Sequence, residues 1–229
     1  MPLRAFSLWA AGLLLLVGTA CQIGPPELTA KEVLDRAADA AEKVNSAHFA
    51  LEQQNGILAI GPGLQVGSAE GDVAQPDRVK LTFTLQFAGM NAETQVIGLG
   101  DEVFVTNPIS KQWQRAPAGL SVPRVLDKTR GVPGLLRKVS DPQKVGNETL
   151  DGAQTQHIKG NVPAAAFTDM TGGEPTDGNV TSEVWVSPVD FLLRQVRLAG
   201  AISSGDTAET VRVLKFSKFN EPVSIERPV

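Results

Sequence analysis

The segment VKLTFTLQF at residues 79–87 alternates apolar and polar side chains without a break. A period of two is typical of a β-strand with one buried face, because successive side chains point to opposite sides of the sheet. The apolar positions are Val79, Leu81, Phe83, Leu85 and Phe87. Nine residues give a strand of about 30 Å, longer than the usual five or six residues. The pattern therefore predicts an antiparallel sheet that is covered on one face and wet on the other.

Shorter segments of the same period follow along the chain, separated by Gly, Asn, Asp and Pro. They begin at Ala47 and continue at residues 93–99, 102–106, 112–115, 154–159, 182–187, 192–198 and 210–219. Gly100-Asp101 lies between two of them as a turn. Short strands spaced by turn residues indicate hairpins in series, that is, a meander.

Residues 29–44 change to a helical period. Thr29 and Glu32 have the spacing of a capping box at a helix start. Val33, Ala37 and Ala41 lie on the predicted apolar stripe, which is made mostly of alanine. A stripe of alanines lets a helix approach a neighbouring surface closely.

Two further regions interrupt the strands. Residues 120–140 carry Pro123 and Pro133, each placed to open a short helix, and residues 164–170 predict another. The aliphatic side chains of residues 120–136 exceed what a loop needs, so this segment is a candidate lid or mouth. Those used in that prediction are Val125, Leu126, Leu135 and Leu136.

Residues 1–20 resemble a secretory signal, with an apolar run at residues 8–17 that is shorter than the roughly 20 residues needed to cross a bilayer. Cys21 follows small residues, as in a lipobox, where the thiol is acylated and becomes the new N-terminus. Gly18 stands where an aliphatic residue is usual. We expect residues 1–20 to be removed and Cys21 to be the lipid anchor on a tether of residues 21–28. The alternative is an ordinary secretory signal with an incidental cysteine.

The charge balance excludes some partners. The chain has a formal net charge of −4, and removal of Arg4 with the signal makes it −5. Nucleic acid is bound through clustered Lys and Arg, so no nucleic-acid partner is expected. The sequence contains no polybasic run, so we expect no electrostatic docking on anionic lipid headgroups. Because Cys21 is the only cysteine, neither a disulfide nor a cysteine metal site is expected.

Signals of catalysis are weak. The two histidines, His48 and His157, have no other histidine or cysteine at metal-ligand spacing, so we expect no metal site and no cofactor. Ser68 lacks the spacing of a nucleophile elbow. We expect no catalytic residues and no enzyme; an enzyme would require a carboxylate pair in a cleft.

The order of these features resembles the LppX/LprAFG lipoproteins of bacterial cell envelopes. The resemblance rests on the acylated-cysteine start and on segments 46–54, 79–87, 100–117 and 180–200. It covers nearly the whole mature chain, although the related LolA and LolB carriers share the same general half-barrel. The family implies an α+β fold: a strongly curved antiparallel sheet, or half-barrel, with helices packed in its concave face over residues 29–229.

The resemblance also implies a function. Family members are similar to carriers, which hold acylated lipid or glycolipid in an apolar cavity between sheet and helices and pass it across the envelope. The expected cavity wall consists of Val33, Ala37, Ala41, Leu81, Phe83, Leu85, Phe87, Val96, Phe104, Val125, Leu126, Leu135 and Leu136. We expect a monomer at the extracytoplasmic side of the cell membrane, with an envelope transport partner. The alternative is an interaction or sensor module, because an ordinary filled core has the same apolar alternation.

Overall fold

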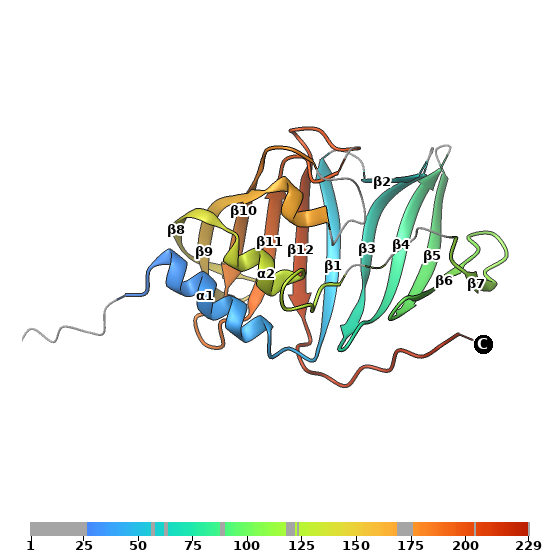
Figure 1. Cartoon of the computed structure of the whole chain (residues 1–229), viewed down its shortest axis with the longest axis horizontal. Helices are drawn as coiled ribbons and strands as arrows, with labels where there is room; N and C mark the ends of the chain where they lie inside the picture. The colour runs from blue at the N-terminus through green and yellow to red at the C-terminus, as the bar shows by residue number, and fades with distance from the viewer. Residues whose placement is uncertain are drawn as a thin grey trace, which may run out of the picture.

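The computed structural model describes residues 27–228, except residues 56–57, 62–63, 88–89, 118–121, 123, 169–175 and 204. Most of this chain lies in one antiparallel sheet with two helices and a short 3₁₀ helix (Figure 1). The strands are β1 (Ser46–Asn55), β2 (Leu58–Gly61), β3 (Leu64–Ala74), β4 (Arg78–Phe87), β5 (Met90–Leu99), β6 (Glu102–Thr106), β7 (Trp113–Arg115), β8 (Ser140–Leu150), β9 (Ala153–Pro163), β10 (Asn179–Val186), β11 (Leu193–Ala199) and β12 (Val211–Ser217). The helices are α1 (Ala30–Ala41), α2 (Val132–Arg137) and η1 (Ala164–Phe167).

The sheet consists of two meanders that meet at its centre. Its order is β7-β6-β5-β4-β3-β1-β12-β11-β10-β9-β8, with β2 paired to β3. The first and last strands of the chain, β1 and β12, pair in the middle. The connection from β7 at one edge to β8 at the other must therefore return across the sheet, and α2 lies on this return path (Figure 1).

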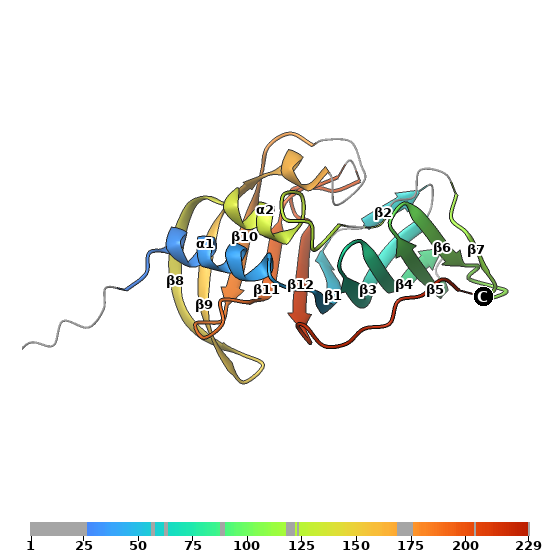
Figure 2. The ribbon, with the colours of Figure 1, turned by 60° about the horizontal axis from the view of Figure 1, so that its bottom comes forward.

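Both helices lie on one face, here called the inner face. Figures 1 and 2 show α1 and α2 over the half of the sheet formed by β8–β12, while none of the described helices lies over β3–β7. The sheet is curved and unclosed around this face. The expected fold class, a curved antiparallel half-barrel with helices on its concave face, is confirmed.

The predicted start of α1 is confirmed. The backbone N of Glu32 donates to Thr29 Oγ1 at 3.2 Å, and the backbone N of Thr29 donates to Glu32 Oε2 at 2.7 Å. These two bonds satisfy donors that a helix start leaves free. The apolar stripe is buried, and Arg137 of α2 pairs with Asp39 and Glu42 at 2.7 Å each. The two helices therefore form one layer over the sheet.

Other predictions need correction. Strand β8 is absent from the sequence prediction, because most of its side chains are exposed at a sheet edge and show no apolar alternation. Residues 124–131 form turns rather than the helix expected after Pro123, which itself lies outside the described residues. The helix at Pro133 is confirmed as α2. No helix in the described part of the chain is long and apolar enough to cross a membrane.

Candidate functional site

The strand register sorts the inner-face side chains into rows that run across the sheet. Paired residues on adjacent strands lie on the same face, so each row is read directly from the register. The lower row is Ala47, Val73, Val79, Gly98 and Val103. The middle row is Phe216, Phe49, Gly71, Leu81, Val96 and Val105. The upper row is Val196, Leu214, Leu51, Ala69 and Phe83.

The upper row is incompletely covered. Phe83, Leu51, Leu214 and Val196 are only half-buried, whereas Leu81 of the middle row is 1% exposed. The five residues of this row, here called the apolar strip, cross the adjacent strands β4, β3, β1, β12 and β11. Four strand spacings of about 4.8 Å make the strip roughly 19 Å long. One leaflet of a bilayer core, about 15 Å of hydrocarbon, is shorter than this.

The predicted wall residues divide into two groups. Side chains in the filled core are Val33, Ala37, Ala41, Leu81, Leu85, Val96, Val125 and Leu136. Half-buried side chains are Phe83, Leu126 and Leu135. Of the predicted residues, only Phe83 belongs to the apolar strip. Cys21 and the side chain of Phe87 lie outside the described part.

Phe104 lies on the outer face, opposite to the other predicted wall residues. Its strand neighbours Val103 and Val105 face inward, so strand alternation turns Phe104 outward. The guanidinium groups of Arg115 and Arg227 lie 6.0 and 5.4 Å from its ring centroid. Both arginines also pair with Glu102. Phe104 is therefore part of an outer cation–π cluster and not of the inner wall.

Four strip residues are missing from the predicted wall, namely Leu51, Ala69, Val196 and Leu214. Val196 and Leu214 fall in segments predicted as strands, and Leu51 lies just after the expected strand start. Their place beside Phe83 depends on the pairing of β1 with β12, which are 156 residues apart from Asn55 to Val211. Alternation gives the face of each residue, but not the strand that lies next to it.

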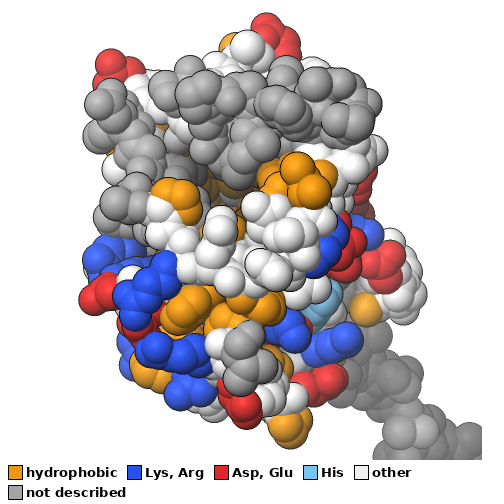
Figure 3. Space-filling view, turned by 90° about the vertical axis from the view of Figure 1, so that its right-hand side faces the viewer, with side chains coloured by type: hydrophobic (Ala, Val, Ile, Leu, Met, Phe, Trp, Pro, Cys, Tyr) orange, Lys and Arg blue, Asp and Glu red, His pale blue; other side chains and the backbone are white. Residues whose placement is uncertain are grey.

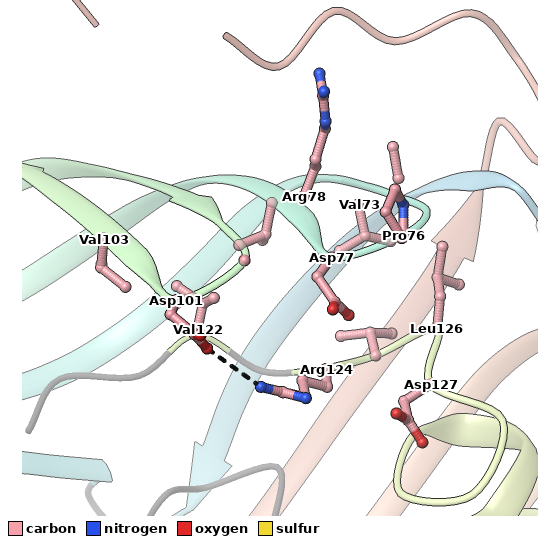
Figure 4. A pocket seen from close by; sticks show the side chains of 14 residues that line it. Val73, Pro76, Asp77, Arg78, Asp101, Val103, Val122, Arg124, Leu126 and Asp127 are labelled. Atoms are coloured by element: carbon pink, nitrogen blue, oxygen red, sulfur yellow. Dashed lines mark ion pairs between the residues drawn. The ribbon is translucent and has the colours of Figure 1, made fainter. Parts of the chain in front are cut away.

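A cavity of about 130 Å³ opens below the strip, at the lower end of the inner face (Figure 4). The described residues 122 and 124–131, between β7 and α2, are here called the return segment. The apolar walls of the cavity are Val73, Val79 and Val103 of the sheet and Val122, Val125 and Leu126 of the return segment. Asp77, Arg78, Asp101, Arg124 and Asp127 supply its charged side chains. Figure 3 shows the neighbouring end of the molecule, where hydrophobic side chains reach the surface between Lys and Arg side chains.

The return segment closes this cavity by a close fit at Gly98. A Cβ atom at Gly98 would lie 2.6 Å from Cγ2 of Val122 and 2.7 Å from Cγ1 of Val79. Only glycine leaves room for Val122 against β5 at this point. The backbone N of Val132 donates to the carbonyl of Val125 at 3.0 Å, which joins the return segment to α2.

The histidines are engaged in side-chain pairs on the outer face. His48 Nδ1 lies 2.8 Å from Asp72 Oδ1. His157 is buried and stacks on Trp185 at 4.2 Å, with Nδ1 2.7 Å from Glu148 and Nε2 3.1 Å from Glu183. Hydrogen bonds from Trp185 and then His157 hold the pKa of Glu148 below its ordinary value. No group of three or more metal-ligating side chains occurs among the described residues.

The chain is similar in sequence and in fold to several mycobacterial proteins. The lipoarabinomannan carrier protein LprG of Mycobacterium leprae is 26% identical over 200 residues, 84% of this chain and 79% of LprG. LppX of Mycobacterium tuberculosis, named as a candidate phthiocerol dimycocerosate transporter, is 30% identical over 192 residues, 82% of this chain and 75% of LppX. The crystal structure of LprF from Mycobacterium bovis matches with a TM-score of 0.69 at 18% identity, covering 90% of this chain and 99% of LprF.

The matches that assign the family extend over nearly the whole described chain. The crystal structure of LppX from Mycobacterium tuberculosis matches with a TM-score of 0.60 at 21% identity, covering 86% of this chain and 98% of LppX. The sequence profile of the LppX_LprAFG lipoproteins matches residues 29–225, from the N-cap of α1 to the C-terminal segment. The chain belongs to the LppX_LprAFG lipoprotein family.

Proposed function

We propose that this protein is an exported lipid carrier that binds one or more acyl chains against the apolar strip and passes the lipid across the cell envelope. Residues 29–229 form the lipid-binding part, and Cys21 anchors it to the extracytoplasmic side of the membrane after removal of residues 1–20. LprG, a relative, is named as a lipoarabinomannan carrier. The name of this relative therefore associates a protein of similar sequence with the carriage of lipid.

The apolar strip is the observation that carries the proposal. Its four half-buried side chains lie on β4, β1, β12 and β11, and Ala69 of β3, which is 4% exposed, completes the row between Phe83 and Leu51. An acyl chain laid along the strip gains about 0.8 kcal/mol for each methylene it buries. This gain in binding free energy depends on the length of the acyl chain and not on the chemistry of the rest of the lipid, which suits a carrier for acylated molecules.

Lipid entry requires an opening, and the return segment supplies it in this proposal. Residues 124–137 are attached to the sheet by apolar contacts and to α1 through the pair of Arg137 with Asp39. Withdrawal of Val122 from the space over Gly98 would separate the segment from β5. Because apolar contacts are non-directional, such a segment can leave and return without breaking a hydrogen-bond ladder.

Lipid extraction is the first test. The Cys21→Ser protein, exported by its native host and purified without its anchor, is extracted and its lipids are measured by mass spectrometry. A stoichiometric acylated species is the expected result. A folded protein free of lipid, which also takes up none from vesicles, would contradict the carrier and favour the alternative of an interaction module with a filled core.

A second test separates a lipid space from a filled core. Leu214→Trp enlarges a strip residue; Val189→Trp, at an 89% exposed hairpin position, is the control. In a carrier, the tryptophan occupies space meant for lipid, so lipid retention falls while the stability of the lipid-free protein changes by less than about 1 kcal/mol. In a filled core the same change is overpacking and costs about 1–3 kcal/mol.

A further inference from the structure

The cavity at the lower end of the inner face has polar groups at its rim that the fold itself does not use. Asp77 lies on the turn between β3 and β4, and Asp101 lies on the turn between β5 and β6. Arg124 faces them from the return segment (Figure 4). The carboxylate of Asp77 makes no hydrogen bond or ion pair within the described part of the chain. Arg124 Nη2 approaches Asp101 at 3.6 Å, and the Asp101 side chain is 99% exposed.

The other two charged groups of the lining are already engaged. Backbone amides of Arg130 and Thr129 donate to Asp127 at 2.8 and 2.9 Å. These bonds, with that of Arg130 first, hold the pKa of Asp127 below its ordinary value. Arg78 donates to the carbonyl of Ile225 at 3.1 Å. Asp77, Asp101 and Arg124 are therefore the groups with free hydrogen-bonding capacity.

The size of the cavity limits what enters it. At about 130 Å³ it has room for roughly four water molecules at their volume in the liquid. Ligand pockets for whole drug-sized molecules are larger, about 300–1,000 Å³. A single small ring or a polyol fits, whereas a pair of acyl chains does not.

The charge of the rim selects among small polar groups. Three carboxylates and two guanidinium groups line the cavity, so its formal charge is −1. A phosphate placed there meets the unpaired carboxylate of Asp77, and it must compete with Asp101 for the guanidinium of Arg124, which lies 3.6 Å from Asp101. A hydroxyl-rich uncharged group instead donates to Asp77 and Asp101 and accepts from Arg124, with its carbon face against Val79 and Val103. The chemistry favours the uncharged group.

We infer that this cavity binds an uncharged, hydroxyl-rich headgroup of the carried lipid and discriminates against headgroups that bear phosphate. The inference rests on the proposed lipid-carrier function. Half-buried Val103 and Val105 of β6 lead from the cavity toward Phe83 of the apolar strip. Headgroup and acyl chain thus have places on the same inner face, with the buried middle row between them.

The test compares two lipids that share the same acyl chains. Binding of monogalactosyl diacylglycerol and of phosphatidic acid to the Cys21→Ser protein is measured by titration from mixed micelles. The native rim is expected to bind the galactolipid about tenfold more tightly, since each hydrogen bond to a charged group contributes enough for such a factor. Asp77→Lys is expected to reverse the preference. Asp77→Asn, which removes one negative charge from the rim, is expected to narrow the preference by weakening galactolipid binding and strengthening phosphatidic acid binding.

Asp177→Lys is the matched control, because Asp177 is an exposed aspartate on the loop before β10, outside the cavity lining. It is expected to leave the preference unchanged, and thermal unfolding of every variant checks that the fold persists. Equal affinity for the two lipids, or an unchanged preference in folded Asp77→Lys and Asp77→Asn proteins that still bind lipid, would overturn the headgroup site alone. Failure of the unsubstituted protein to bind either lipid would instead contradict the carrier function.

Discussion

The two halves of the sheet have the same strand pattern but different inner surfaces. Over β8–β12, α1 and α2 cover the sheet, and Ile158, Val180 and Val186 are each 0% exposed. Over β3–β7 the cover is the return segment, and Phe83, Val103 and Val105 stay half-buried. One half is a conventional core, while the other keeps apolar surface partly accessible.

Under the proposed function, stability depends mainly on the residues beneath the helices, and lipid binding depends on the apolar strip of the same sheet. Ile158, Val180 and Val186 are fully buried in the helix-covered half, so this packing can hold the fold whether or not a lipid is present. The apolar strip starts at Val196 and Leu214 in the covered half and ends at Phe83 in the open half. Lipid binding would thus extend a core that is already formed, rather than create one.

The largest effect is expected from truncation in the covered half. Leu34→Ala removes a 0% exposed side chain of α1 and is expected to lower the free energy of unfolding by about 2–5 kcal/mol. Leu51→Ala removes the same atoms from the half-buried strip and is expected to cost about 1 kcal/mol, because less apolar area is lost. Urea unfolding of the lipid-free protein measures both.

Lipid retention is expected to rank these two variants in the opposite order. Leu51→Ala loses lipid contacts, whereas folded Leu34→Ala keeps the strip intact. Equal stability losses for the two leucines would mean that both halves are packed alike, and the comparison would then fail.

A loss of stability of intermediate size is expected from a change in the fit between the return segment and β5. Gly98→Ala places a Cβ 2.6 Å from Val122, and the resulting overpacking is expected to cost about 1–3 kcal/mol. Val122→Ala in the same chain is expected to restore part of that loss. A double-mutant cycle on unfolding free energies measures the coupling. Independent, additive effects would show that Val122 does not hold the segment against β5.

The sequence predicts the strands and the helix start in both halves of the sheet, but not which inner-face side chains stay half-buried. The alternation at residues 79–87 and the capping box at Thr29 are properties of neighbouring residues, and both are confirmed as β4 and the start of α1. The half-buried state of Phe83 depends on where the helices stop on the sheet. The neighbours of Phe83 in the apolar strip depend in turn on the central pairing of β1 with β12, a contact that no local pattern encodes.

Two other differences have the same cause. Phe104 is apolar and lies in a predicted strand, yet it packs on the outer face under Arg227 from the C-terminal segment. Strand β8 is polar because it is an edge strand with little to bury. In both places a distant segment, or the lack of one, decides the environment of the side chain.

The smallest effect is expected on the outer face of the covered half, where Glu148 accepts from Trp185 Nε1 at 2.7 Å and lies 2.7 Å from His157 Nδ1. These contacts lower the pKa of Glu148 in the folded state, so its stabilising contribution is present above the ordinary glutamate range near pH 4.3 and is lost as the pH falls below it. Glu148→Gln removes this titration and is expected to cost about 0.2–1 kcal/mol at pH 7, a small value because the side chain is 45% exposed.

The measurement is unfolding free energy from pH 7 to pH 3, followed by Trp185 fluorescence. Glu148→Gln is expected to show a shallower acid decline than the unsubstituted protein, whereas Glu209→Gln, at an exposed position in the loop before β12, serves as the control for loss of one charge. Lipid binding at pH 7 is expected to stay unchanged in both variants, because Glu148 lies on the face opposite the apolar strip. A loss of lipid binding in Glu148→Gln would mean that the outer network governs the inner surface, and the separation of the two roles would have to be abandoned.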